Sequence, residues 1–195
     1  MTTRAELRSL LAQGRHALSV GRVKEAVALV RAQPRLTTHL VELLFDEDAG
    51  ASQRAADVLE RMTARATAKP DIGGAGAASI ERILAREKDA ILGLLVESRA
   101  KTHLKKLRWN LALIVPRLKL TPAECRRAAD VLNTWLDDPS SIVKTLALQG
   151  LADLSRLDPS LLAPVVDLLR LYGRSGTPAM RARSRILLKK LERRA

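Results

Sequence analysis

The sequence has 195 residues and carries 34 Lys and Arg against 21 Asp and Glu, a formal net charge of +13. Aromatic residues make up only 2% of it, and a single cysteine excludes an internal disulfide and is typical of a reducing compartment. No apolar run approaches the roughly 18 residues that span a bilayer, and the first residues lack the apolar segment of a secretory signal, so we expect a cytoplasmic protein with no membrane partner.

The first third of the sequence predicts a helical hairpin followed by a helix pair. Apolar residues at helical spacing predict helices over residues 3–18 and 22–32, separated at Gly21. We interpret residues 1–33 as a cap on the elements that follow, because the end units of a repeat array need an atypical outer face. The same spacing predicts a HEAT-like pair of helices over residues 34–65, a resemblance explained below.

Residues 66–78 lose this periodicity. Three glycines, one proline and several small side chains predict a flexible insertion there. Ser79 then restarts the helical pattern, and residues 79–195 predict three further helix pairs in one continuous domain.

The positive charge is concentrated in two segments of this last region. Residues 99–119 contain seven Lys or Arg and no acid, and residues 170–195 contain nine against Glu192 alone. These segments are therefore the places to look for contact with an anionic partner, although plain solubility explains such charge equally well.

Two spacings indicate an internal repeat. Four helix starts combine a capping residue with a proline, at Pro122, Pro139, Pro159 and Pro178. Taking every second start gives periods of 37 and 39 residues. The apolar pattern of the second helix in each pair begins at Leu107, Val143 and Met180, which are 36 and 37 residues apart. Both spacings indicate a two-helix unit of about 37 residues.

Most aromatic residues follow the same period. Trp135 and Tyr172 lie 37 residues apart, each at the end of a first helix, and Phe45 ends an earlier one. We interpret these three as core side chains rather than ligand-stacking residues. Trp109 has no counterpart in the other copies.

These repeats resemble the HEAT-repeat family. Its pattern is a first helix, a turn with Asp or Pro, and a second helix that begins with an apolar–basic pair. Residues 137–139 with Val143-Lys144 fit this pattern, and similar pairs stand at 107–108 and 180–181. The resemblance implies an all-α, right-handed solenoid of HEAT-like helix pairs after the N-terminal hairpin. It also implies that the second helices line a concave surface that holds another macromolecule.

The second helices place basic residues at matching positions. On a helix that turns about 100° per residue, Arg108, Lys144 and Arg181 occupy equivalent places beside the apolar stripe. The candidate binding residues on this flank are Lys101, Lys105, Arg108, Lys144, Arg181, Arg185 and Lys189. They would bind phosphates or an acidic partner. We call Arg108, Lys144 and Arg181 the basic ladder. The structural alternative, which we favour for Lys144, is that the basic ladder pairs with turn acids such as Asp137 and Asp138.

The leading functional hypothesis is a non-enzymatic scaffold that binds a protein or acidic peptide in its concave groove. An alternative is a nucleic-acid-binding module that uses the basic second helices, although Leu148 and Ala152 interrupt a continuous track. From the enzyme class, DNA glycosylases for alkylated bases resemble the chain in their helix pairing. Only Trp135 with Asp137 or Asp138 could form the pocket that they need.

No motif indicates a metal, a cofactor or a catalytic residue. His16, His39 and His103 are far apart, and Cys125 has no neighbouring His. We expect Cys125 to be an inert thiol, although its place on the first turn of a helix could also lower its pKa. The sequence leaves the oligomeric state open.

Overall fold

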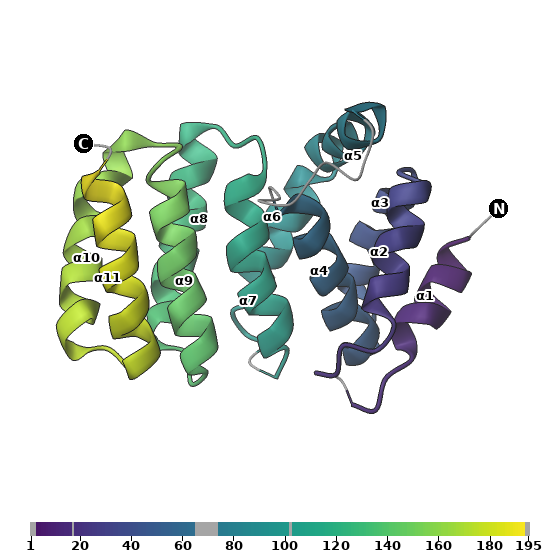
Figure 1. The fold of residues 1–195 in the computed structure, drawn as a ribbon, viewed down its shortest axis with the longest axis horizontal. Coiled ribbons are helices and arrows are strands. Elements are labelled where there is room, and N and C mark those ends of the chain that lie inside the picture. Colours follow the sequence, from purple (N-terminus) through teal and green to yellow (C-terminus); the bar gives the residue numbers. More distant parts are fainter. Residues whose placement is uncertain (1–2, 17, 65–73, 102, 194–195) are drawn as a thin grey trace. The chain divides into compact units, whose positions relative to one another are not determined.

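The structure, a computed structural model, describes residues 3–16, 18–64, 74–101 and 103–193. In these ranges the chain forms eleven α-helices and four short 3-10 helices, with no strand, so the all-α prediction is confirmed (Figure 1). None of these helices is long and apolar enough to cross a bilayer. The chain divides into two compact units, Met1–Leu94 and Leu95–Ala195, and the boundary falls within the sixth helix.

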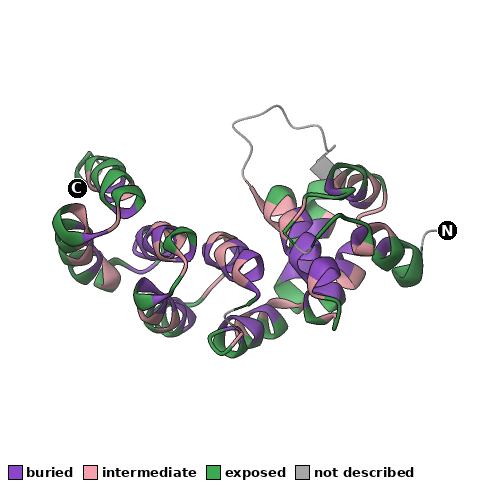
Figure 2. Ribbon diagram, turned by 90° about the horizontal axis from the view of Figure 1, so that it is seen from below, coloured by how far each residue is buried: buried purple, intermediate pink, exposed green. Residues whose placement is uncertain are grey.

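The first unit is built around one helix. Its helices are α1 (Arg4–Ala12), α2 (Val23–Ala32), α3 (Leu36–Glu42), α4 (Ala49–Thr63), α5 (Gly74–Arg86) and most of α6 (Lys88–Glu97). α4 packs against α1, α2 and α3, and α3 packs against α5. Small residues on α4, including Ala51 and Ala55, are fully buried and allow this close approach. Figure 2 shows α4 as one of the most extensively buried helices of the unit.

The second unit consists of two rows of helices. Its helices are α7 (Lys105–Ile114), α8 (Pro122–Thr134), α9 (Ser141–Leu154), α10 (Leu162–Ser175) and α11 (Pro178–Glu192). α9 lies between α7 and α11 and packs against both, while α8 and α10 form the second row behind them (Figures 1 and 2). α9 therefore holds the unit together.

Side-chain capping fixes the start of two α-helices in the second unit, α8 and α11. Thr121 and Glu124 form a capping box at the start of α8, and the Thr177 hydroxyl accepts a hydrogen bond from the Met180 amide at the start of α11. The predicted start at Pro139 is wrong by two residues, because Ser140 rather than Asp138 precedes α9. Pro159 begins a 3-10 turn, Pro159–Leu161, and not an α-helix.

Helix boundaries in the first unit differ from the sequence prediction in three places. The first helix ends at Ala12 instead of residue 18, and the helix expected from Ser79 begins at Gly74. Residues 74–78 of the predicted insertion are therefore helical, and residues 66–73 lie outside the described part of the chain. The expected single helix after Ser79 is divided at Glu87 into α5 and α6.

A buried arginine explains the early end of α1. Arg54 of α4 is only 2% exposed, and its guanidinium donates to the carbonyl oxygens of Leu11, Ala12 and His16, the last two at 3.0 and 3.2 Å. The last carbonyls of a helix have no partner within the helix. Arg54 supplies that partner from a residue about 40 positions away, which no local pattern predicts.

The aromatic residues only partly fulfil their predicted role as core side chains. Trp135 is buried at 1% exposure, and Tyr172 is half-buried. Phe45 is 44% exposed, so its prediction as a core residue is wrong. It ends a 3-10 turn, Leu43–Phe45, whose two leucines take the buried positions instead.

Candidate functional site

The predicted basic ladder lies at equivalent helix positions in the second unit. α7, α9 and α11 begin at Lys105, Ser141 and Pro178. Arg108, Lys144 and Arg181 are therefore each the fourth residue of their helix. Their surroundings nevertheless differ strongly, and these surroundings decide which residues can bind a partner.

Arg108 is a structural residue and not a binding residue. It is 1% exposed and forms an ion pair with the buried carboxylate of Asp138, in the turn before α9. Its guanidinium also lies 5.9 Å from the centroid of the Trp135 ring. Asp138 uses its other oxygen to accept a hydrogen bond from the Ser140 amide at 2.7 Å. The prediction of Arg108 as a groove residue is wrong, and the alternative pairing with a turn acid is confirmed for this rung.

The same flank of α7 faces α9. Ala112, one turn after Arg108, is fully buried, and a Cβ added to Gly150 of α9 would come within 2.6 Å of the Ala112 carbonyl oxygen. On α9 the corresponding residues, Leu148 and Ala152, are also buried. In α7 and α9 the ladder flank is therefore a packing surface between neighbouring helices.

On α11 the same flank is exposed to solvent. Arg181, Arg185 and Lys189 are all exposed, and no described helix follows α11 to cover them. We call these three residues the α11 basic flank. Arg181 donates to the Gly176 carbonyl oxygen at 2.8 Å, which anchors it at the start of the helix. With a rise of 1.5 Å per residue, the three side chains span about 12 Å.

An apolar side chain accompanies these charges. Ile186 follows Arg185 and is 50% exposed, although it lies on a helix whose other face is well packed. Because successive residues of a helix are about 100° apart, Ile186 borders the α11 basic flank and does not lie on it.

Lys144, the α9 residue of the basic ladder, does not form the ion pair with a turn acid that we favoured from the sequence. It is half-buried, and within the described residues no ion pair or hydrogen bond of its side chain is found. Arg108 already occupies Asp138, and residues 174–177, the turn before α11, contain no acid that could pair with Lys144 as Asp138 pairs with Arg108.

Lys101 and Lys105 do not extend the ladder along α7. Lys101 lies in the loop before the helix and makes a surface ion pair with Glu97 at 3.9 Å. Lys105 is the first residue of α7 and is half-buried. The predicted continuous flank from Lys101 to Arg108 is therefore wrong, because the helix begins later than expected.

Two further examples of a turn carboxylate bound by an arginine lie among the described residues. Arg8 of α1 makes two hydrogen bonds, of 2.6 and 2.9 Å, to Asp46, which also accepts from the Asp48 amide. The hydrogen bonds from Arg8 lower the pKa of Asp46 below its usual value. No feature of the sequence pattern in this region predicted the pair.

The third example lies in the second unit. Asp158 accepts hydrogen bonds from the Ser160 hydroxyl and amide at 2.7 and 3.0 Å, and Arg126 of α8 donates to it at 2.7 Å. The Ser160 hydroxyl is the main cause of a lowered pKa of Asp158, and Arg126 adds to it. Asp-Pro-Ser occurs at both 138–140 and 158–160, and this repeated tripeptide is the sequence signal that could have located both turns.

Trp135, Asp138 and Cys125, which the sequence analysis considered for catalysis, are all buried. Trp135 is buried with Arg108 over its ring, so it cannot stack on a nucleotide base. Cys125 is buried, and burial raises the pKa of its thiol, which disfavours the reactive thiolate form. Among the described residues no group of three or more His, Cys, Asp or Glu is placed to hold a metal ion.

Comparisons with known proteins give information on the fold alone. No protein-family model matches the sequence, and no curated protein matches it. A crystal structure described as an engineered protein, a structural genomics consortium target, is similar over 97% of this chain and 72% of its own length. The TM-score is 0.56 and the sequence identity is 14%. The similarity therefore concerns the helical fold and says nothing about the function of this chain.

Proposed function

We propose that this chain is a non-enzymatic, HEAT-like helical-repeat scaffold of the cytoplasm, and that it binds an acidic segment of a partner protein along the α11 basic flank. The observation that carries the proposal is the exposure of Arg181, Arg185 and Lys189 on α11. On α7 and α9 the same flank is buried at Arg108, Ala112, Leu148 and Ala152. A surface built to contact a neighbouring helix is well suited to receive a helix from another protein.

The repeat architecture is supported by sequence and packing together. The 36- and 37-residue spacings of Leu107, Val143 and Met180 recur as a row of helices, α7, α9 and α11, in which each packs against the next. We propose that this row continues the right-handed solenoid implied by the HEAT resemblance. In that arrangement the partner occupies the flank of α11, where a further repeat would stack, and not the concave groove.

Two observations favour a protein partner over a nucleic acid. A basic track along the second helices is interrupted, because Arg108 is paired and Leu148 and Ala152 are apolar and buried. Ile186, half-exposed beside Arg185, offers an apolar contact that a phosphate backbone does not use. An acidic amphipathic helix would match both the charge and the apolar side chain.

Fluorescence anisotropy tests this choice of partner. The probes are a labelled Glu- and Leu-rich amphipathic peptide, duplex DNA and single-stranded RNA, each titrated at several salt concentrations. We expect Arg185→Gln and Ile186→Ser each to weaken peptide binding by about tenfold, the equivalent of 1.4 kcal/mol. Tighter binding of either nucleic acid, with a steep salt dependence and no effect of Ile186→Ser, would favour the nucleic-acid alternative instead.

A further inference from the structure

An arginine and a turn aspartate form the same kind of contact at three places among the described residues. The pairs are Arg8–Asp46, Arg108–Asp138 and Arg126–Asp158. Each aspartate lies in the turn before a helix or a 3-10 turn, and its side chain is at most 6% exposed. We call this contact a turn-acid pair.

The backbone holds the aspartate of each turn-acid pair in the same way. One carboxylate oxygen accepts a hydrogen bond from the amide two residues further on, at Asp48 (2.9 Å), Ser140 (2.7 Å) and Ser160 (3.0 Å). An aspartate that bonds its own backbone in this manner forms a compact turn. The carboxylate is therefore oriented before the arginine meets it, which lowers the entropy cost of the contact.

Arg181 has the helix position of one of these arginines without the aspartate. Like Arg108, it is the fourth residue of a second helix and carries a guanidinium. It donates to the Gly176 carbonyl oxygen at 2.8 Å, and among the described residues it forms no ion pair. Arg108 meets an acid from the turn that precedes the next second helix, but no described helix follows α11. No described turn therefore supplies Arg181 with an acid corresponding to Asp138.

The choice of arginine at position 181 favours a carboxylate partner. Lys144 takes the same helix position on α9, and residues 174–177, the turn before α11, contain no acid. A lysine is thus found where the turn acid is absent, and an arginine is found at 108, where it is present. A guanidinium offers paired, planar donors that match a carboxylate, whereas an ammonium is a compact point charge.

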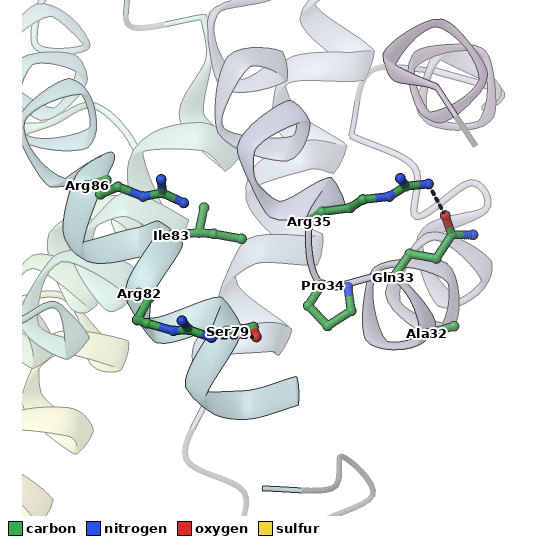
Figure 3. Close-up of a pocket in the computed structure, with 8 residues that line it drawn as sticks. All are labelled: Ala32, Gln33, Pro34, Arg35, Ser79, Arg82, Ile83 and Arg86. Atoms are coloured by element: carbon green, nitrogen blue, oxygen red, sulfur yellow. Dashed lines mark hydrogen bonds between the residues drawn. The ribbon is translucent and has the colours of Figure 1, made fainter. Parts of the chain in front are cut away.

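The arginines of a pocket in the first unit do not combine these features. Figure 3 shows Arg35, Arg82 and Arg86 around this pocket of about 810 Å³, where Arg35 donates to Gln33 at 3.2 Å. Arg35 precedes α3, and the other two are the ninth and thirteenth residues of α5. Helix position therefore distinguishes Arg181 from these arginines.

We propose that Arg181 binds an aspartate in the turn that precedes a helix of the partner protein, as Arg108 binds Asp138. This inference rests on the proposed binding of an acidic segment along the α11 basic flank, and it states which part of that segment meets Arg181. The occupant is an Asp-Pro-Ser type of turn, with its aspartate held by the amide two residues on, followed by a helix.

Contacts between α7 and α9 indicate the direction of the partner helix. The turn before α9 meets Arg108 near the start of α7, and Gly150, later in α9, approaches the carbonyl oxygen of Ala112, one turn further along α7. The two helices therefore run parallel. A partner helix docked in this way begins beside Arg181 and continues past Arg185. Acidic side chains in its first turns would meet the α11 basic flank, and the helix dipole favours acids there.

Fluorescence anisotropy with three labelled peptides tests this inference on the full chain. The first peptide has an Asp-Pro-Ser turn followed by a Glu- and Leu-rich amphipathic helix. The second has asparagine in place of the turn aspartate, which keeps a capping side chain without its charge. The third exchanges the turn aspartate with a serine at the far end of the peptide, so its net charge is that of the first. We expect the second and third peptides to bind the unmodified chain about tenfold more weakly than the first.

Variants of the chain assign this difference to one side chain. With Arg181→Gln, the three peptides should bind about equally, because the partner of the turn aspartate is gone. With Arg185→Gln, all three should bind more weakly while the tenfold difference between them remains. Arg127→Gln, which removes an exposed arginine of α8, is the control and should change nothing. Circular dichroism of each variant checks that the fold is retained.

The outcomes separate this inference from the proposed function. Equal binding of the three peptides to the unmodified chain, still weakened by Arg185→Gln, overturns the role of Arg181 and supports the proposed function. Equal loss of the difference in Arg181→Gln and Arg185→Gln also overturns that role, because general positive charge then recognises the aspartate. Binding by none of the peptides overturns both.

Discussion

Arg108 and Asp138 form a buried ion pair that joins α7 to the turn before α9, with both side chains 2% exposed. Arg108 also covers the Trp135 ring, and Asp138 also caps the Ser140 amide. The pair therefore fixes three elements at once: a helix, a turn and the aromatic residue that ends the preceding helical segment. The sequence pattern predicted that Arg108 lies on a binding surface. In the structure it is buried in the contact between α7 and the turn before α9.

Removing one partner of this pair should strongly destabilise the protein. Arg108→Met leaves the Asp138 carboxylate buried without its cation, and losses of about 3–5 kcal/mol are typical of such changes. We expect urea denaturation to show a loss of about 3 kcal/mol in the free energy of unfolding. Arg8→Met, which breaks the more exposed Arg8–Asp46 pair, is the comparison and should cost less.

A double variant separates the pair from the bulk of its side chains. Arg108→Met combined with Asp138→Asn removes both charges, so its loss should be smaller than the sum of the single losses. Additive losses would show that the two residues act independently, contrary to the structure.

Arg54→Met should loosen α1 selectively. The carbonyl oxygens of Leu11, Ala12 and His16 would lose their donor, and an unsatisfied buried polar group costs about 1–3 kcal/mol. Hydrogen exchange should therefore accelerate at the amides of α1, while the amides of α9 serve as the internal control. Uniform acceleration in both helices would contradict a local role for Arg54.

Replacing glycine by alanine should have opposite effects on stability at two positions. Gly150→Ala would bring a Cβ within 2.6 Å of the Ala112 carbonyl oxygen and 2.8 Å of Leu132 Cδ1, so we expect a loss of about 1–3 kcal/mol. Gly93 is exposed within α6 and a Cβ there meets nothing within 4 Å. Gly93→Ala should therefore stabilise the helix by about 0.5–1 kcal/mol. Thermal denaturation of both variants tests how closely α7 and α9 approach.

The carboxylates of Asp46 and Asp158 should make the stability of the folded protein sensitive to acid. The pKa values of Asp46 and Asp158 are lowered in the folded state, so their stabilising effect is present above the ordinary carboxyl pKa and is lost as pH falls through the folded values. Urea midpoints should stay level near neutral pH and fall from about pH 5 toward pH 3. Asp158→Asn keeps a capping side chain without a titrating group, and should flatten that fall. An unchanged pH dependence in this variant would count against the Asp158 contribution.

Helical periodicity predicts positions around a helix, and this explains which sequence predictions succeeded. The prediction that Arg108, Lys144 and Arg181 take equivalent helix positions was correct, because it depends on local helix geometry alone. What faces each residue depends on the neighbouring helix and turn: an acid at 138 pairs with Arg108, no acid at 174–177 is available to Lys144, and no described helix covers Arg181.

Long-range contacts account for the features that were missed. The end of α1 depends on Arg54, which reaches it only after α4 has packed against α1.

The proposed partner surface is tested most directly by quantitative affinity capture with charge-reversed chains. Arg181, Arg185 and Lys189 are changed together to Glu and compared with the unmodified chain. The matched control changes three other exposed arginines of the same unit to Glu, Arg127, Arg170 and Arg174. We predict that the bound proteins of the unmodified chain carry acidic segments, are lost with the α11 reversal and are kept with the control. Retention of the same partners by the α11 reversal would contradict the account.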